Sequence, residues 1–308
     1  VGSIKDKTLT EILTADVAVS PNNGPFGPGD AVLEQTLRDF IELQSNTIAV
    51  GTNLVGVRSV NWTEFKWYSG AEGSFTYPLD DSAVADPTKI GTSSYTAQLS
   101  KGQGRTVFLD STLLRGESWE NMDRQQMAIV RNRADVIDTT ILSALVSGAG
   151  QTLAVAAGAE WDTDSEDAEG NILSAMDKIF ENGRVSGDEP LALVVPAKLR
   201  STLMNTSLYG NVVQSLADHM ASVANMTIYF SRDSNLSDTA LLLIPGSETA
   251  EFFTYNGPGF METELTRIPG VGYDWLLTSY MGTVIHEHQD GADAGKNNRI
   301  CTITNVCA

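Results

Sequence analysis

Residues 101–150 read KGQGRTVFLDSTLLRGESWENMDRQQMAIVRNRADVIDTTILSALVSGAG, a stretch that could hold either a phosphate-binding loop or a structural helix. A phosphate loop needs G-x-x-x-x-G-K-[ST], or G-x-G-x-x-G between a strand and a helix. Gly102 and Gly104 precede an expected strand at residues 106–110, and neither a third glycine nor a Lys-Ser/Thr pair follows at the required spacing. The stretch therefore predicts a strand that leads into a helix.

The second half of this stretch has the periodicity of one long helix. Ser118 is a candidate N-cap, and Gly148 and Gly150 are typical of a helix end. About 30 residues at about 1.5 Å each make a rod of about 45 Å. The apolar positions of one face, interrupted at Gln126, are Trp119, Met122, Val130, Ala134, Ile137, Ile141 and Leu145. Because no heptad charge pattern favours a free coiled coil, we expect the rod to pack along a sheet.

Composition and charge exclude several classes of protein. The 308 residues are 42% hydrophobic, which is enough for a substantial core and excludes wholesale disorder. The formal net charge of −19 makes the chain a poor general binder of nucleic acid. This acidity is typical either of an ordinary acidic protein or of adaptation to high salt, and thus of a halophilic host. No apolar run approaches 18 residues, so we expect no membrane span.

The N-terminal region lacks the apolar core of a signal peptide. Its first residue, Val1, is compatible with removal of an initiator Met, an upstream start or cleavage of a longer precursor. Residues 20–30, SPNNGPFGPGD, are rich in helix and strand breakers, so residues 1–30 are expected to form an extended arm. Residues 30–44 predict an amphipathic helix with Asp30 at its N-cap.

Between residues 57 and 110 the apolar period changes to two. Phe65 and Trp67 share one side of NWTEFKWY, and alternation also marks residues 73–79 and 93–99 around a polar loop. We expect 73–79 and 93–99 to form a long β-hairpin. Because an isolated two-stranded ribbon is marginal in water, the hairpin is expected to rest on another subunit.

The second half of the chain mixes helices and strands. An acidic loop at 159–171 is expected to be exposed, and helices are predicted at 171–183, at 197–204 behind Pro196, and at 212–220. Buried or alternating runs predict strands at 191–195, 226–231, 240–244, 251–255, 273–280, 282–288 and 299–306.

Candidate metal ligands are few. His286 and His288 alternate onto one face of a predicted strand, which fits either a shared metal or a solvated face. Asp162, Asp164 and Glu166 are spaced as in a calcium loop. The sixth position lacks the glycine and the twelfth lacks the glutamate of an EF-hand, which leaves a loose cation site or a solvated acidic tip.

The two cysteines, Cys301 and Cys307, lie in RICTITNVC. Six strand residues would separate them by about 20 Å, whereas a disulfide needs Cα atoms about 4.4–6.8 Å apart. We expect two buried thiols, with a bond to a neighbouring chain as the alternative.

The order of these elements resembles that of the major capsid proteins of tailed bacteriophages and archaeal tailed viruses, whose HK97-like fold is shared with encapsulins. RTVFLDSTLLRGESWENMDRQQMAIVRNRADVIDTTILSALVSGAG resembles the strand, turn and spine helix of that family. NILSAMDKIFENG and EPLALVVPAKLRSTLMN resemble the opening of its axial domain, and GYDWLLTSYMGTVIHEHQ and RICTITNV resemble its closing strands.

The resemblance implies an α+β, HK97-like capsid fold in seven segments. They are an N-terminal arm (1–30), a short helix and peripheral-domain segment (31–56), an extended β-hairpin loop (57–106), the spine helix of the peripheral domain (107–150), the axial domain (151–250), peripheral-domain strands (251–292) and a C-terminal strand of the axial domain (293–308). Lys66, Lys89 and Lys101 lie in or beside the loop, where some family members crosslink, but none matches the reactive position.

The resemblance also implies a structural function. We expect a major capsid protein that self-assembles as pentamers and hexamers into an icosahedral shell around viral double-stranded DNA, in the virion after assembly in the host cytoplasm. Portal, scaffold and decoration proteins are expected partners, with no specific DNA binding and no membrane. We expect no enzyme activity and no catalytic, cofactor or metal residues. An encapsulin-type compartment is the alternative, and an acidic hydrolase is a third.

Overall fold

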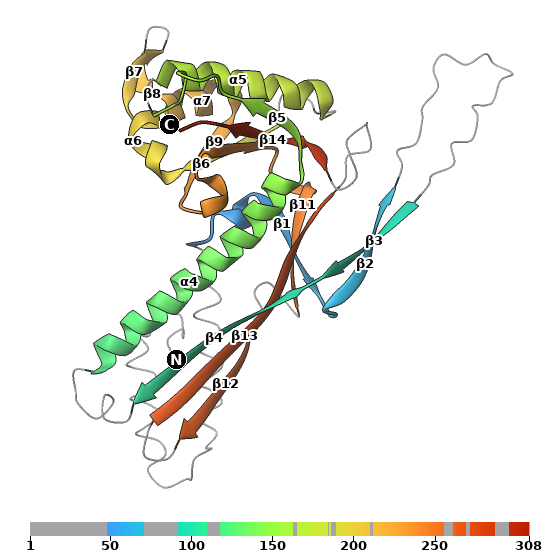
Figure 1. Cartoon of the computed structure of the whole chain (residues 1–308), viewed down its shortest axis with the longest axis vertical. Coiled ribbons are helices and arrows are strands. Elements are labelled where there is room, and N and C mark those ends of the chain that lie inside the picture. The colour runs from blue at the N-terminus through green and yellow to red at the C-terminus, as the bar shows by residue number, and fades with distance from the viewer. Residues whose placement is uncertain are drawn as a thin grey trace, which may run out of the picture.

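The computed structural model describes residues 48–70, 92–109, 118–162, 165–183, 185, 189–209, 212–255, 261–268, 272–286 and 296–307. The predicted arm (1–30) and the predicted helix at 30–44 lie outside these residues. Two five-stranded sheets dominate the described chain, and one long helix runs along both (Figure 1). No described helix is long and apolar enough to cross a membrane.

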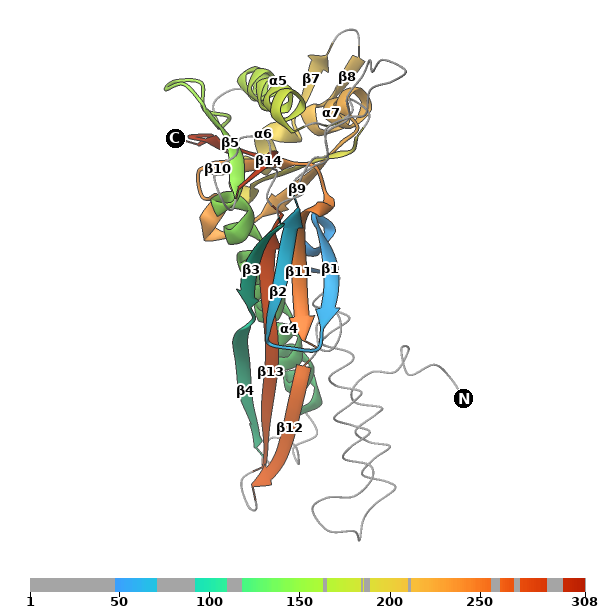
Figure 2. The ribbon, with the colours of Figure 1, turned by 90° about the vertical axis from the view of Figure 1, so that its right-hand side faces the viewer.

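The first sheet, called the long sheet here, extends along the helix (Figure 2). Its order is β1-β11-β13-β12, with β4 also paired to β13. β1 is parallel to β11, and the other pairs are antiparallel. Its strands are β1 (Val55–Val60), β4 (Ser100–Leu109), β11 (Gly246–Tyr255), β12 (Met261–Ile268) and β13 (Gly272–Ile285).

β13 replaces the two separate strands predicted at 273–280 and 282–288. Gly282, where the second predicted run begins, lies inside this strand. A Cβ there would be 3.2 Å from Leu99 Cδ2, so the glycine allows Leu99 to approach the sheet closely. A glycine inside a strand thus marks a close contact here, and the two predicted runs form one strand.

The second sheet, called the body sheet here, has the order β5-β14-β10-β6-β9. β5–β14 and β6–β9 are parallel pairs, and β14–β10 and β10–β6 are antiparallel. Both faces are covered by helices, which is why β6 is one continuous buried apolar run. The strands are β5 (Ala149–Ala154), β6 (Leu191–Pro196), β9 (Met226–Ser231), β10 (Thr239–Leu243) and β14 (Asn297–Thr304).

The long helix α4 (Ser118–Ser147) has the predicted extent, and its apolar face is as predicted from Val130 onward. Val130, Ala134, Ile137, Ile141 and Leu145 are each at most 1% exposed. The last four share a core with residues from both sheets, namely Phe252 and Met281 of the long sheet and Leu241 and Leu243 of the body sheet. The helix therefore packs against two sheets, where the sequence predicted one.

The other face of the body sheet carries α5 (Ser165–Asn182) and α7 (Leu216–Ala224). α5 begins earlier than predicted, inside the supposed exposed loop. Trp161 in that loop is fully buried, and its backbone N–H donates to Val306 O at 2.9 Å. Trp161 therefore holds this loop against the body. Burial of its large apolar ring stabilises the fold more than exposure of the neighbouring acidic residues does.

The predicted helix at 212–220 is only half correct. Its first four residues form β8 (Val212–Ser215), which pairs with β7 (Thr206–Tyr209). Ser215 is the N-cap of α7, and its Oγ accepts the N–H of Asp218 at 3.1 Å. The remaining short elements are η2 (Gly51–Asn53), η3 (Ala197–Leu199), α6 (Arg200–Leu203) and η4 (Ser234–Leu236).

The second strand of the predicted hairpin pairs with a segment that was not assigned to the hairpin. β3 (Thr92–Gln98) pairs antiparallel with β2 (Glu64–Gly70), while residues 73–79, its predicted partner, lie outside the described part of the chain. Lys66 pairs with Thr96, and Phe65 pairs with Ala97. Alternation alone could not choose between two candidate partners, because both have a period of two.

Candidate assembly interface

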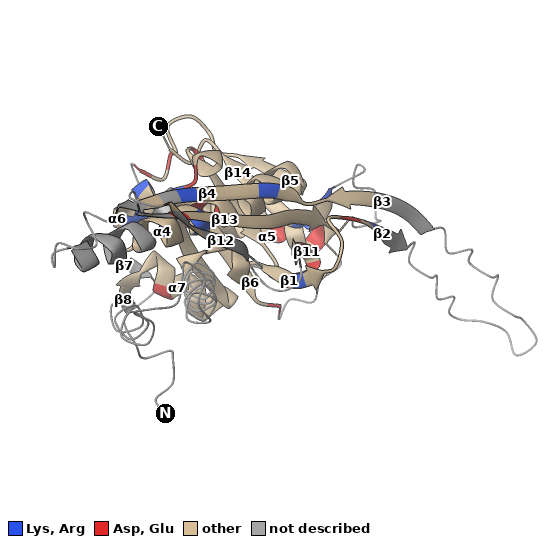
Figure 3. Ribbon diagram, turned by 90° about the horizontal axis from the view of Figure 1, so that it is seen from below, with Lys and Arg blue, Asp and Glu red and all other residues tan. Residues whose placement is uncertain are grey.

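Within the described part of the chain, the β2–β3 ribbon contacts the long sheet near its base, where a hydrogen bond also links its own two strands. The rings of Phe65 and Phe253 are 4.6 Å apart at their centroids, and Leu99 N–H donates to Thr63 O at 2.8 Å. Beyond this base the ribbon leaves the body (Figures 1 and 3). A two-stranded ribbon gains little stability by itself, so this element is suited to contacts with a second molecule.

Several large apolar side chains are exposed around the same region and along α4. Trp62, at the base of the ribbon, is 74% exposed. Val57 on β1, Val107 on β4 and Val136 on α4 are each more than 40% exposed. Isolated exposed valines are ordinary, but an exposed tryptophan is enriched at protein interfaces. Trp62 is thus the strongest single contact candidate, and the sequence analysis missed it although it stands in NWTEFKWY.

One face of β4 and β13 is polar. Arg105 donates from Nε and Nη2 to the two carboxylate oxygens of Asp274, at 2.9 and 2.6 Å. This paired hydrogen bond raises the pKa of Arg105 and lowers the pKa of Asp274. Gln103 Nε2 donates to Thr278 Oγ1 at 3.2 Å. These cross-strand pairs stabilise the register of β4 on β13.

The opposite face of β4 carries the two glycines from the opening stretch. Gly102 and Gly104 lie inside β4, opposite Ser279 and Leu277, so they form no turn around a phosphate. The sequence predicted that both glycines precede the strand, and this was wrong because they lie inside it. The exclusion of a G-x-G-x-x-G turn agrees with this placement. Their missing side chains leave a hollow of about 310 Å³ between β4, β13 and α4, lined also by Arg133 and Val136.

The histidine pair is only half described. His286 follows β13, and its Nε2 is 3.6 Å from Glu251 Oε2, while Arg58 Nη1 is 3.8 Å from the same oxygen. His288 lies outside the described residues. Among the described residues, no group of three His, Cys, Asp or Glu side chains is arranged to hold a metal ion.

One of the three candidate calcium ligands lies in a helix. Glu166 belongs to α5, so it is not part of a loop, and Asp164 lies outside the described residues.

Cys301 and Cys307 are both buried free thiols, as predicted. β14 ends at Thr304, so Cys307 lies beyond the strand that was expected to contain it. Burial raises the pKa of Cys301 to about 11 and also raises that of Cys307.

Two of the three loop lysines lie within the described part of the chain. Lys66 is exposed on β2, Lys101 lies on β4 with its Nζ 6.0 Å from the ring centroid of Tyr280, and Lys89 lies outside the described residues. The features of this region that suit contacts with another molecule are thus the β2–β3 ribbon and the exposed apolar side chains, Trp62 above all.

Residues 92–290 match the profile of a family described as "Phage capsid protein". The chain belongs to this family. The capsid protein is therefore a component of a virion. A search of curated protein sequences found no match.

Solved structures show the same fold at low sequence identity. A virus-like particle from Pyrococcus furiosus matches with a TM-score of 0.61 and 10% identity, over 87% of the capsid protein and 97% of the other chain. The mature capsid of bacteriophage PhiM1 gives 0.58 and 11%, over 83% and 86%. The capsid of Myoviridae phage XM1 gives 0.55 and 13%, over 85% and 90%. The HK97-like fold expected from the sequence is thus confirmed.

Proposed function

We propose that the capsid protein is the major shell subunit, and that copies of it assemble as pentamers and hexamers into a closed icosahedral shell around viral double-stranded DNA. The family match supports a capsid function, and the virus-like particle and phage capsids that share the fold support a shell. The same match favours this function over an encapsulin-type compartment.

The β2–β3 ribbon is the observation that carries the proposal. It contacts the long sheet through Phe65 and Leu99, and it pairs with no third strand among the described residues. A ribbon with so little support from its own subunit needs a neighbouring surface to bury its faces. Self-assembly supplies that surface without any catalytic step, which fits a structural protein and not an enzyme.

The two sheets support a division into domains. We propose that the long sheet with α4 is the peripheral domain, and that the body sheet with α5 and α7 is the axial domain. β1 and β4 pair within the long sheet, although most of their residues fall in the segment 57–106 expected to be the extended loop. We therefore restrict the proposed loop to residues 61–99.

The acidic charge bears on the enclosed genome. A subunit with a formal charge of −19 is a poor partner for a polyanion, so DNA would be confined by the shell and not bound specifically. Portal, scaffold and decoration proteins would complete the particle, and assembly would take place in the host cytoplasm.

Electron microscopy of the purified protein, with analysis of particle contents, tests the proposal. Closed particles of uniform diameter are the expected result, and particles from infected cells should contain double-stranded DNA. A protein that remains monomeric under all salt conditions would refute a shell function. Particles that contain one cargo protein and no DNA would instead support an encapsulin-type compartment.

A further inference from the structure

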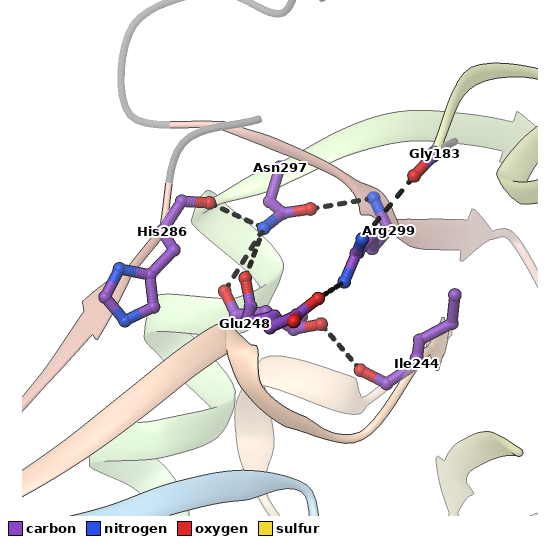
Figure 4. Close-up of polar contacts among 7 residues, drawn as sticks. Gly183, Ile244, Glu248, His286, Asn297 and Arg299 are labelled. Atoms are coloured by element: carbon purple, nitrogen blue, oxygen red, sulfur yellow. Dashed lines mark hydrogen bonds and ion pairs between the residues drawn. The ribbon is translucent and has the colours of Figure 1, made fainter. Parts of the chain in front are cut away.

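Within the described part of the chain, the two sheets of the capsid protein meet close to the C-terminal end of α4. The chain passes from one sheet to the other there at the junction of α4 with β5 and at the junction of β10 with β11. The end of β13 also lies next to the start of β14 (Figures 1 and 4). Apolar residues of both sheets share one core with α4. The apolar core resists large movements through its close packing, and hydrogen bonds add preferred directions. The polar contacts at the crossing therefore constrain the angle between the sheets in addition to the core.

Asn297 supplies the central polar contact. Its side chain belongs to the body sheet and is 1% exposed. Its Nδ2 is 2.5 Å from His286 O and 3.3 Å from Thr249 O, and Glu248 O lies at 3.5 Å. One buried amide therefore bonds backbone carbonyls at the ends of two different strands of the long sheet. Its Oδ1 accepts the N–H of Arg299 at 2.8 Å, which fixes the orientation of the amide group.

Arg299 adds a second connection beside the first. Its Nε donates to Gly183 O at 3.4 Å, just beyond α5, and its Nη1 bonds the carboxylate of Glu248 on β11 (Figure 4). Thr249 Oγ1 donates to Ile244 O at 2.7 Å and so fixes the turn that joins β10 to β11. Asn297 and Arg299 together connect the body sheet to the long sheet through side chains.

The backbones at this crossing are too close to slide past one another. A Cβ on Gly148 would lie 2.6 Å from Ile285 Cγ1. A Cβ on Gly150 would lie 2.5 Å from Asn298 Oδ1 and 2.7 Å from Asn297 O. Only glycine fits at either position without displacing a neighbour. The hydrogen bonds of Asn297 are consequently made between segments with little room for rearrangement.

We infer that Asn297 is a positioning residue that fixes the angle between the two sheets, and that this angle sets the curvature with which subunits join into a shell. The second half of this inference rests on the proposed function. A small change of this angle has a large effect at a distance, because β13 has 14 residues and is about 46 Å long. A tilt of about 5° at the crossing would move the far end of β13 by about 4 Å. Contacts between side chains are lost over such a distance.

A pair of neighbouring asparagines provides a matched test. Asn297 and Asn298 are both buried in β14, but Asn298 accepts from Gln151 of β5 and so acts within the body sheet. We expect Asn297→Ala and Asn298→Ala to lower the melting temperature by similar amounts. Only Asn297→Ala should give particles with a broadened or shifted diameter by electron microscopy. Small-angle X-ray scattering of unassembled subunits should show a wider distribution of maximum dimensions for the same variant alone.

Each outcome separates this inference from the proposed function. Particles of Asn297→Ala with the diameter and uniformity of the wild type would overturn the curvature role. An unchanged scattering curve for this variant would overturn the fixed angle, whether or not shells form. Failure of the wild type to assemble would refute the proposed function, and scattering would then decide the angle alone. If Asn297→Ala does not fold, the milder Asn297→Ser, which keeps one donor, is measured against Asn298→Ser by the same criteria.

Discussion

Replacing Ile137 by aspartate tests the buried face of α4 most directly. Ile137 is fully buried in the core that α4 shares with both sheets. Loss of its burial costs about 1.5–3 kcal/mol. An unpaired carboxylate at the same place costs several kcal/mol more. Asp138 is the next residue, and its carboxylate would add repulsion of like sign. The total is about 5 kcal/mol or more, comparable to the whole stability of a typical domain at about 5–15 kcal/mol.

Val136→Asp is the matched control, because Val136 precedes Ile137 and is 50% exposed. We expect it to cost less than about 1 kcal/mol. Urea unfolding of unassembled subunits, followed by circular dichroism, measures both variants. Ile137→Asp should be insoluble or unfolded without urea, while Val136→Asp should unfold near the wild-type midpoint. Equal midpoints for the two variants would refute the assignment of the buried face.

Three further outcomes are expected. Deleting residues 64–98 and joining Thr63 to Leu99, which already share a hydrogen bond of 2.8 Å, should leave a folded subunit that forms no shells by light scattering. Asp138→Asn should unfold at an equal or higher urea concentration than the wild type at neutral pH, because burial raises the pKa of Asp138 and penalises its ionised form, while an amide oxygen can still accept the Gly51 N–H. Shells should be stable at about 1 M salt and loosen near about 0.01 M, where the Debye length grows from about 3 to about 30 Å and subunits of −19 repel.

Each of these has a clear contrary result. Global unfolding of the deletion variant would place the ribbon in the subunit core. For Asp138, a raised folded pKa means that stability is highest in the neutral form at low pH and is lost as pH rises through that pKa. The advantage of Asp138→Asn should therefore shrink as the pH is lowered towards about 4, and a growing advantage would contradict the argument. Shells that persist at about 0.01 M salt without divalent ions would remove the high-salt interpretation and leave the capsid family unaffected.

Local sequence patterns predicted the elements whose stability is local. α4 was predicted at nearly its observed extent because its apolar positions recur at helical spacing over many turns and glycines follow it. β6 was predicted because both of its faces are buried, which produces a continuous apolar run. The order of such elements was sufficient to identify the fold.

Pairing between distant segments could not be predicted in the same way. Residues 73–79 and 64–70 both alternate, and only the three-dimensional structure selects 64–70 as the partner of β3. The contacts of Asn297 join residues that are 11 to 49 positions away, and the sequence around it, KNNRIC, has no feature that indicates a buried amide. Trp161 was placed on the surface because its neighbours are acidic, although its own size favours burial.

The position of β14 has a consequence for synthesis of the capsid protein. β14 lies between β5 and β10, so among the described strands β5 joins the body sheet only through a strand that is translated much later. At about 5–20 residues per second, the roughly 140 residues between β5 and β14 take about 7–28 s to appear. During that interval β6, β9 and β10 can already pair with one another, whereas β5 has no partner strand in this sheet. A nascent chain that has not reached β14 therefore holds an unpaired β5, and a chain terminated before β14 cannot complete the body sheet.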